Sequence, residues 1–369
     1  MKTLSVQLAD RSYPIHFGRG LKGLLRDTFD SLEGDGRRLA MLADGVFDKD
    51  SFKYFDALDF KITRTPPRAV RFVHPGEKSK SLEELTENYA FLAENGIDRK
   101  GALFAFGGGV VGDLTGFTAS TWLRGIDFYQ IPTTLLAMVD SSVGGKTGIN
   151  VPAGKNLVGA FWQPQAVFID LDLLQTLPPR EFAAGMAEVI KYGLLHDANL
   201  FEKLESLQTP LNATAPELEG TVRRCCEIKA EIVAADERET AGSGGRALLN
   251  LGHTFAHAIE KVAGYGEYLH GEAVAIGLVL AGRLSERLGC IQKNDTQRIV
   301  RLLADYDLPT ALRPPLKTDA LIAAMYQDKK TRAGKLRFVT LQSLGRAVTT
   351  DDVPEDWIRE IWDRAMAPP

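Results

Sequence analysis

The amino-acid sequence predicts an α/β protein, with a parallel sheet covered by helices in its first half and a mostly α-helical second half. In the first half, short β-like apolar runs alternate with stretches of helical periodicity, which is the pattern of a parallel sheet. After Leu177-Pro178-Pro179 these runs give way to long helical patterns. Because a proline pair interrupts regular structure, we place the domain boundary there and expect domains at residues 1–178 and 179–369.

The strands of the first half are predicted from short apolar runs. Residues 1–18 alternate apolar and polar side chains, as an edge strand does. Each later run ends in a polar or glycine-rich loop, and ligands of open α/β sheets bind at these carboxyl ends. The later runs are Leu39–Ala43, Ala69–Val73, Leu103–Phe106, Phe128–Ile131 and Val167–Ile169.

Helical periodicity dominates the second half. Two long patterns cover Glu181–Leu195 and Leu218–Ala235. A glycine-rich stretch, Ala241–Gly245, interrupts the helices, and Leu336–Leu341 predicts a late strand.

Composition limits the classes of function. The chain has 369 residues, 44% of them hydrophobic and 25% charged, enough for two domains that each bury a core. The formal net charge is −4 with both signs interspersed, which argues against binding to nucleic acid or to a membrane surface. No apolar run approaches the roughly 20 residues that span a bilayer. Because the net charge is negative, any anionic substrate must be bound by local clusters of basic residues.

The three cysteines predict a reducing compartment. Cys225 and Cys226 are adjacent, so the set forms no disulfide framework and matches no metal-binding Cys-x-x-Cys spacing. The amino terminus also lacks the apolar run of a secretory signal. We therefore expect a cytoplasmic protein.

A glycine motif follows the run Leu103–Phe106. The segment Gly107–Gly112 fits G-x-G-x-x-G, whose glycines let a backbone approach a pyrophosphate group. Its strand is not the first of the sheet, and no acidic residue lies at the expected distance of about 20 residues. A tight strand-to-helix turn explains the motif equally well.

A second glycine-rich stretch, Asp140–Asn156, resembles a phosphate-binding loop. It contains Val143-Gly144-Gly145-Lys146-Thr147, but Asp140 stands where the first glycine of a P-loop belongs, which excludes an ATPase of that class. The stretch also holds Lys155, so it suits an anionic, hydroxylated ligand. The alternative is a solvated surface loop.

Two charged residues share one face of an otherwise apolar helix. Glu188 and Lys191 lie three residues apart, within Gly185–Gly193. They indicate either an intrahelical ion pair or a catalytic pair.

Three of the six histidines fall within eighteen residues. His253 and His257 are four apart and share a helical face, and His270 begins the apolar run Gly271–Leu280. The H-E-x-x-H pattern is absent. A glutamate with two histidines would leave an open position for a substrate oxygen, as catalytic zinc requires. Spacing alone favours a metal site without choosing its histidines.

Five segments, taken together and in order, closely resemble the 3-dehydroquinate synthase family. They extend over nearly the whole chain. They are Gly107–Asp113, Pro132–Thr147, Lys155–Phe161, Ala187–Gly193 and Asn250–Thr254.

This resemblance implies a Rossmann-like domain that binds NAD and a helical domain that holds one divalent metal, Zn²⁺ or Co²⁺. The metal ligands it implies are Glu188, His253 and His270. His257 then becomes a proton carrier or a phosphate contact. The implied NAD contacts are Asp44, Glu77, Lys80, Gly108, Gly109, Val110, Val111, Gly112, Asp113, Thr133, Thr134, Lys146, Lys155, Leu173, Leu174, Gln175 and Thr176.

The resemblance also implies a sugar acid phosphate substrate and a homodimer. In this interpretation Arg246 and Lys229 hold the substrate carboxylate, and Lys191 and Asp140 relay protons. Arg124 reaches the phosphate from the partner subunit. The full set of implied catalytic and substrate-binding residues is Asp140, Lys146, Asn156, Lys191, Lys229, Arg246, Asn250, His257, Arg124 and one of Lys329 or Lys330.

Two segments depart from the family pattern. The family usually has a short Gly-Leu where Ala241–Gly245 precedes Arg246 here. Pro75 and Ser79 stand where the family more often has Asp and Tyr.

The implied reaction converts 3-deoxy-D-arabino-heptulosonate 7-phosphate into 3-dehydroquinate and phosphate, with NAD used catalytically. Two other functions share the expected architecture. A polyol dehydrogenase would release NADH and would not need Lys146, Asn156 or Arg124. Another sugar phosphate cyclase would differ mainly in its carboxylate contacts, and Arg246 with Asn250 favours the dehydroquinate reaction.

Overall fold

The structure is a computed structural model that describes residues 2–47, 68–241, 244–264, 266–313, 316–327 and 336–366. The chain forms two compact units. The first contains Met1–Leu177 and Val222–Ala234, and the second contains Pro178–Thr221 and Ala235–Pro369.

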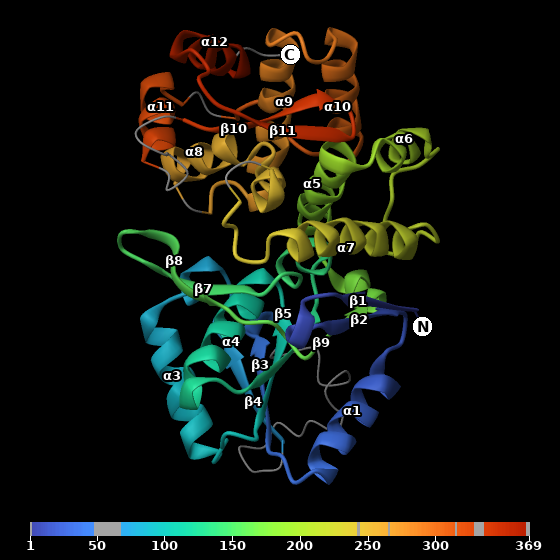
Figure 1. Ribbon diagram of the computed structural model, residues 1–369, viewed down its shortest axis with the longest axis vertical. Helices are drawn as coiled ribbons and strands as arrows, with labels where there is room; N and C mark the ends of the chain where they lie inside the picture. The colour runs from blue at the N-terminus through green and yellow to red at the C-terminus, as the bar shows by residue number, and fades with distance from the viewer. Residues whose placement is uncertain are drawn as a thin grey trace. The chain divides into compact units, whose positions relative to one another are not determined.

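One sheet organises the first unit (Figure 1). Among the described residues it has the order β1-β2-β9-β6-β5-β3-β4, with β1 and β2 antiparallel and the other pairs parallel. Every strand that the sequence predicts in this half is present. The bounds are β1 Lys2–Val6, β2 Tyr13–Gly18, β3 Leu39–Asp44, β4 Arg68–Val73, β5 Ala102–Gly107, β6 Asp127–Pro132 and β9 Ala166–Asp170.

Side chains alternate between the two faces of the sheet, and helices bury both faces. Leu42 and Leu103 belong to a core cluster with residues of α3 (Leu82–Glu94) and α4 (Gly109–Thr121). Phe104 points the other way, where it meets Phe29 of α1 (Lys22–Gly34) edge to face, with ring centroids 4.8 Å apart. Burial on both faces explains why these strands read as continuous apolar runs.

The strand order changes direction between β3 and β5. From β3 the chain adds β4 on one side and then returns to add β5, β6 and β9 on the other. Ligands of doubly wound sheets bind outside the carboxyl ends of the strands at such a switch point. Asp44 ends β3 and Gly107 ends β5, so both lie at this position.

The stretch Asp140–Asn156, expected from the sequence to be a loop, is mostly regular structure. A π-helical turn covers Ala137–Ser141, and β7 (Lys146–Val151) pairs antiparallel with β8 (Gly154–Phe161). The strands approach so closely that a Cβ atom on Gly159 would lie 2.1 Å from the Thr147 carbonyl oxygen. The glycines of this stretch therefore permit close strand pairing.

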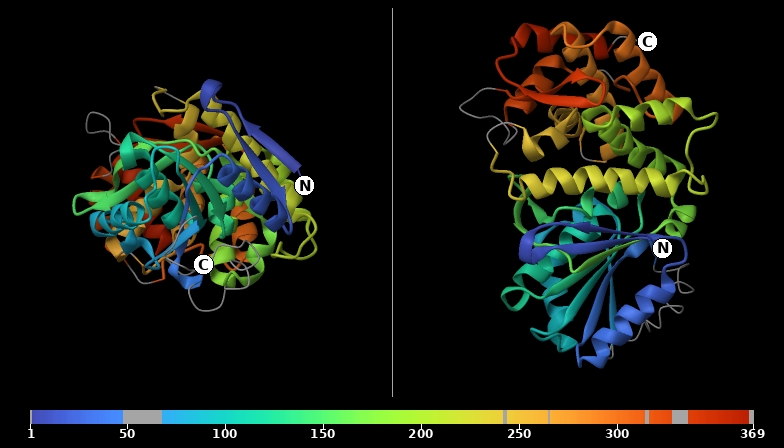
Figure 2. Two further views of the ribbon diagram at one scale, coloured as in Figure 1. Left: turned by 90° about the horizontal axis from the view of Figure 1, so that it is seen from below. Right: turned by 45° about the vertical axis from the view of Figure 1, so that its right-hand side comes forward.

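The second unit is mostly helical, as predicted, and its β10–β11 ribbon packs on α9 (red-orange in Figure 2). No helix in the described ranges is long and apolar enough to cross a membrane. The elements of this unit are α5 Pro179–His196, α6 Ala198–Ser206, α8 His253–Ala263, α9 His270–Arg287, α10 Lys293–Asp305, α11 Thr318–Tyr326, β10 Phe338–Ser343, β11 Arg346–Thr350 and α12 Glu355–Ala365, and α7 (Leu218–Ala235) belongs for most of its length to the first unit.

Helix α7 is assigned differently by sequence and by structure. The sequence placed all of it in a domain at residues 179–369, whereas residues 222–234 pack with the first unit. Cys226 Sγ donates to the Met138 carbonyl oxygen at 3.2 Å, and Lys229 Nζ donates to Asp140. Such long-range pairing leaves no mark in local periodicity.

Glu272 fixes the start of α9. Its carboxylate accepts hydrogen bonds from the Leu269 backbone N–H at 2.9 Å and from Arg180 Nε at 2.7 Å. Arg313 Nη2 lies 2.6 Å from the same carboxylate, which is only 7% exposed. Burial opposes ionisation, but the two arginines and the backbone N–H outweigh it and lower the pKa of Glu272 to about 2.

We predict that Glu272→Gln makes the metal-free protein less stable at neutral pH and flattens its acid dependence. A lowered pKa contributes stability above the ordinary glutamate value of 4.5, and this contribution is lost as the pH falls toward 2. Urea unfolding of both chelator-treated proteins between pH 7 and 2.5 measures the difference. Parallel stability curves would show that Glu272 contributes no such linkage.

Candidate active site

Three helices of the second unit bring Glu188, His253 and His270 together. Glu188 lies within α5, His253 begins α8 and His270 begins α9. One ligand atom from each side chain lies within 4.8 Å of the others. Both imidazole Nε2 atoms lie 3.7 Å from Glu188 Oε1.

Glu188 is fully buried in this cluster. Its Oε2 is ion-paired with Lys191, which is 1% exposed, so the ion pair expected from the spacing exists. Its Oε1 accepts no hydrogen bond from any residue that the structure describes. A buried carboxylate oxygen without a donor is costly, and a bound cation would satisfy it.

Both histidines are oriented through their Nδ1 atoms. His253 Nδ1 lies 3.2 Å from the Leu251 carbonyl oxygen, an acceptor that requires Nδ1 to carry the proton. His270 Nδ1 lies 3.6 Å from Glu260 Oε1. Burial lowers the pKa of His270, but Glu260 and Glu188 outweigh it and raise the pKa. Such contacts leave Nε2 as the ligand atom on each ring.

These residues fit a divalent metal of the zinc type. Two imidazole nitrogens and one carboxylate oxygen converge, and this donor set leaves a coordination position open to substrate. His257 lies close by, with its ring centroid 5.7 Å from that of His253 and 6.5 Å from that of His270. It does not belong to the converging set, a distinction that sequence spacing could not make.

Two glycine contacts let the three helices approach, and sequence reasoning missed both. A Cβ atom on Gly271 would lie 1.9 Å from the Ala184 carbonyl oxygen of α5. A Cβ atom on Gly277 of α9 would lie 2.2 Å from the Gly252 carbonyl oxygen, just before α8. Isolated glycines within helical patterns were the available signal.

Arg246 is buried and lies close in the chain to His253. It is held by hydrogen bonds to Asp236 and Glu237, two acidic residues in the loop after α7. Its backbone N–H donates to Asp236 Oδ2 at 3.2 Å, and its Nη1 donates to the Glu237 carbonyl oxygen at 2.7 Å. Asp236 also accepts from the backbone N–H groups of Thr240 and Ala241. Asn250 ends the 3-10 helix Gly245–Asn250. Within the inserted stretch, Gly242 and Ser243 lie outside the described residues, as do Lys329 and Lys330.

In the first unit, the glycine motif forms the start of α4 at the switch point. Gly108 is the N-cap residue, and a Cβ atom on Gly109 would lie 3.0 Å from Ser141 Oγ. Gly107 is equally confined, because its Cβ would lie 2.8 Å from the side chain of Val111. Val110, Val111 and Gly112 follow in the first turns of α4. The exposed N–H groups of such a helix start suit a pyrophosphate.

Four of the predicted NAD and substrate contacts, Glu77, Lys80, Asp113 and Asn156, form one network. Lys80 Nζ donates to Asp113 Oδ2 at 2.7 Å and also to Asn156 Oδ1. Asn150, which sequence reasoning missed, joins the network by donating to Glu77 Oε1 at 2.8 Å. Burial raises the pKa of Asp113 against the opposing effect of Lys80.

Asp140 and Lys229 form a second pair in the first unit. Lys229 Nζ lies 2.8 Å from Asp140 Oδ1 and also donates to the Asp140 carbonyl oxygen. Lys229 is 6% exposed, so its charge is compensated by this carboxylate. The charge of Lys229 also lowers the pKa of Asp113, by less than burial raises it and by less than the charge of Lys80 lowers it.

The other predicted contacts of the first unit follow its strands or lie on the β7–β8 hairpin. Asp44 Oδ1 accepts from the Val46 N–H, and burial raises the pKa of Asp44. Thr133 and Thr134 follow β6. Lys146 and Lys155 lie on the β7–β8 hairpin. Leu173, Leu174, Gln175 and Thr176 belong to the 3-10 helix Leu171–Thr176, in which only the leucines are buried.

Comparison with known proteins covers almost the entire chain. Residues 70–184 match the family profile described as 3-dehydroquinate synthase N-terminal, and residues 185–331 match 3-dehydroquinate synthase C-terminal. A 3-dehydroquinate synthase of Opitutus terrae is 57% identical over 358 residues, which are 97% of each chain.

Two solved structures of related enzymes have similar folds. A 2-deoxy-scyllo-inosose synthase complexed with carbaglucose-6-phosphate, NAD+ and Co2+ has a TM-score of 0.86 at 26% identity, covering 99% of this chain and all of that one. A 2-epi-5-epi-valiolone synthase from Streptomyces hygroscopicus subsp. jinggangensis 5008, with NAD+ and Zn2+ bound, has a TM-score of 0.83 at 26% identity, covering 97% and 98%. The chain belongs to the 3-dehydroquinate synthase family.

Proposed function

We propose that this chain converts 3-deoxy-D-arabino-heptulosonate 7-phosphate into 3-dehydroquinate and phosphate, using NAD and one Zn²⁺ or Co²⁺ ion. The observation that carries the proposal is the convergence of Glu188, His253 and His270, with a buried Glu188 oxygen that has no donor among the described residues. The related cyclases with NAD+ and a metal support the same cofactors. When bound, NAD supplies a hydride acceptor and the metal supplies Lewis acidity toward substrate oxygens.

In this proposal residues of the second unit bind the metal and transfer protons to and from the substrate. Glu188 and the Nε2 atoms of His253 and His270 hold the ion. Lys191 Nζ, which is paired with Glu188, would hydrogen-bond a substrate hydroxyl at the open metal position. His257 lies beside His253 and His270 and acts as a proton carrier or phosphate contact. Asn250 and the fork of Arg246 contact the substrate, with Arg246 suited to a carboxylate.

In the first unit, the switch point between β3 and β5 would hold NAD. The α4 start at Gly108–Gly112 receives the pyrophosphate, and Asp44 at the end of β3 receives a ribose. The ion pair between the buried Lys80 and the partly buried Asp113 would line the adjoining part of the NAD site. The remaining proposed NAD contacts are Glu77, Thr133, Thr134, Lys146, Lys155, Leu173, Leu174, Gln175 and Thr176.

Cationic and amide side chains of the first unit would orient the substrate. Lys146 neutralises the phosphate and Asn156 hydrogen-bonds to it, and this phosphate can itself accept the proton from the carbon next to the oxidised centre. Lys229 and Asp140 act as a charge-compensated pair at substrate hydroxyl and carboxylate groups. Lys329 or Lys330 adds a further substrate contact.

One turnover assay tests this function. Purified protein, substrate and metal are incubated with NAD at a small fraction of the substrate concentration. We expect phosphate and the carbocyclic product in equal amounts, many turnovers per NAD and no net NADH. Stoichiometric NADH without phosphate release would instead assign a polyol dehydrogenase.

We further propose a homodimer in which Arg124 completes the neighbouring subunit's phosphate site. Leu123 and Arg124 have φ angles of 49° and 71°, a strained conformation for consecutive residues other than glycine. Both side chains are exposed. A functional constraint would explain why this strain is retained.

The prediction for Arg124 is intersubunit complementation. Arg124→Ala protein mixed with inactive Lys191→Ala protein should recover about one quarter of wild-type activity, because half of randomly exchanged dimers are mixed and each carries one complete site. Subunit exchange is verified by native mass spectrometry. Complete exchange without recovered activity would show that Arg124 does not act across subunits.

We also propose a cytoplasmic location. The cysteines Cys225, Cys226 and Cys290 are all free thiols. A reducing compartment preserves this state.

A further inference from the structure

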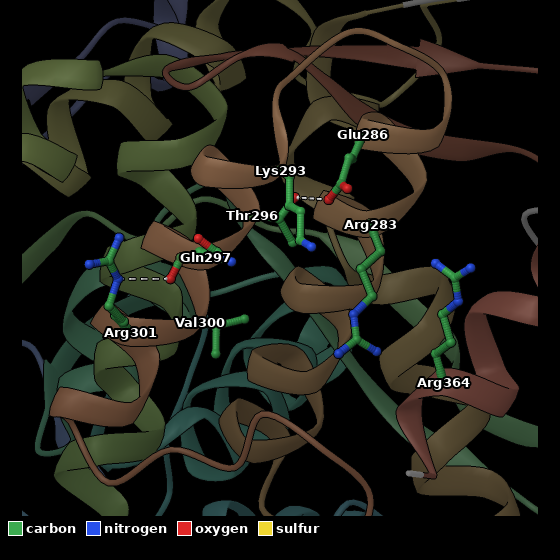
Figure 3. A pocket seen from close by; sticks show the side chains of 8 residues that line it. All are labelled: Arg283, Glu286, Lys293, Thr296, Gln297, Val300, Arg301 and Arg364. Atoms are coloured by element: carbon green, nitrogen blue, oxygen red, sulfur yellow. Dashed lines mark hydrogen bonds between the residues drawn. The ribbon is translucent and has the colours of Figure 1, made fainter. Parts of the chain in front are cut away.

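A cationic pocket lies in the second unit (Figure 3). It is lined by side chains of α9, α10 and α12 and has a volume of about 560 Å³. Arg283 lies 13 residues beyond His270 on α9, roughly 20 Å along the helix at 1.5 Å per residue. The residues that characterise the pocket are Arg283, Lys293, Arg301, Arg364, Glu286 and Val300.

Positive charge exceeds negative charge in this pocket. Four cationic side chains line it with one carboxylate, Glu286, which accepts a hydrogen bond from Thr296 Oγ1 at 2.8 Å. Within the described part of the chain, none of the four cations lies within ion-pair distance of a carboxylate. The pocket therefore carries an excess of about three positive charges before any ligand binds.

Arg283 is the most confined of these cations. Its Nη1 atom is buried and has no hydrogen-bond acceptor among the described residues. Burial, followed by the charge of Arg364, lowers the pKa of Arg283, whereas Glu286 opposes the shift. Figure 3 shows the side chains of Arg283 and Arg364 next to each other in this view, with their guanidinium groups extending in opposite directions. A buried donor beside a second cation requires an acceptor that brings negative charge.

Two neighbouring arginines, unlike the cations of the pocket, are ion-paired with carboxylates. Arg287, one turn further along α9, is ion-paired with Glu360 and lies over the Trp357 ring, 4.6 Å from its centroid. Arg298 of α10 pairs with Glu205 at 2.6 Å. Because carboxylates neutralise these two residues, they add no uncompensated charge beside the pocket.

We propose that this pocket binds a small organic anion with at least two negative charges, carried by phosphoryl or carboxylate groups. Arg283 and Arg364 would hold the anionic groups through paired N–H donors, and Lys293 and Arg301 would close over them from α10. Val300 and the aliphatic stems of the arginines provide apolar contact for the ligand's carbon skeleton. The volume exceeds that of an inorganic anion and lies within the range of small-molecule sites.

Isothermal titration calorimetry tests the site with pyrophosphate and citrate as separate probes, one phosphoryl and one carboxylate. The metal-free protein is used so that neither probe can chelate its metal. At least one probe should bind the wild type, and Arg283→Gln with Arg364→Gln should weaken that binding at least tenfold. Arg359→Gln is the matched control, because Arg359 lies on the same helix α12 but is ion-paired with Asp319. It should bind as the wild type does.

Lys146→Gln separates this pocket from the proposed substrate phosphate site. Binding that persists in Lys146→Gln and disappears in the Arg283/Arg364 variant supports the proposal, and the stronger probe identifies the anionic group. Binding lost only in Lys146→Gln would overturn it, as would binding of neither probe at millimolar concentration. A second copy of this chain is the other candidate occupant of the pocket. Sedimentation of the Arg364→Gln protein tests it, since a change of oligomeric state would assign this surface to contact between copies.

Discussion

Glu188→Gln and His253→Ala are each expected to abolish metal binding and to lower kcat/KM by about 1,000-fold. A Lewis acid contributes several kcal/mol to transition-state stabilisation, and each 1.36 kcal/mol corresponds to a factor of ten. Glu188→Gln replaces the anionic carboxylate ligand with a neutral, weakly ligating amide, and His253→Ala removes an imidazole ligand atom. Metal content by elemental analysis and kcat/KM with added Zn²⁺ or Co²⁺ measure the two effects.

His257→Ala is the matched control for these substitutions. Its ring lies close to those of His253 and His270, yet it stands outside the converging set. The variant should keep one metal per subunit while losing activity. A His257→Ala protein that lost its metal, beside a His253→Ala protein that kept it, would reverse the ligand assignment.

Gly271→Ala should weaken metal binding at least tenfold without altering a ligand. The added Cβ would lie 1.9 Å from the Ala184 carbonyl oxygen, a backbone atom that cannot rotate away. Helix α9 must move from α5, which separates His270 from Glu188. Overpacking of this kind costs about 1–3 kcal/mol of folding stability, occasionally more. Chelator competition gives the affinity, and urea unfolding gives the stability.

Gly220→Ala is the control for a glycine in a helix. In the part of the chain that the structure describes, no atom other than those of its own helix and chain neighbours lies within 4 Å of a Cβ atom built on Gly220 of α7. Alanine there should raise the free energy of unfolding by about 0.5–1 kcal/mol and leave metal affinity unchanged. Equal metal affinity in Gly271→Ala and wild type would show that close helix packing does not position Glu188, His253 and His270.

Local patterns in the sequence predicted most of the fold. The parallel strands are buried on both faces, so their apolar runs were visible without knowledge of their partners. The β7–β8 hairpin was expected to be a loop, because its glycines serve close strand pairing, a contact that local composition does not encode. Residues 222–234 of α7 pack with the first unit through long-range contacts of Cys226 and Lys229.

The candidate site was predicted less completely by residue patterns than by family resemblance. Spacing indicated a metal site but could not choose among His253, His257 and His270. The structure separates them by orientation, because Leu251 and Glu260 bind Nδ1 of His253 and His270 and turn Nε2 toward Glu188. Asn150 and Gly277 were missed because their roles depend on neighbours remote in sequence.

Anomalous X-ray scattering at the zinc or cobalt edge, from crystals grown with the metal, tests the metal centre most directly. We predict one peak per subunit at about 2.0–2.2 Å from Nε2 of His253, Nε2 of His270 and a Glu188 carboxylate oxygen. His257 should lie beyond ligand distance. A peak bonded to His257, or no peak between α5, α8 and α9 in protein that contains stoichiometric metal, would contradict the proposed metal centre.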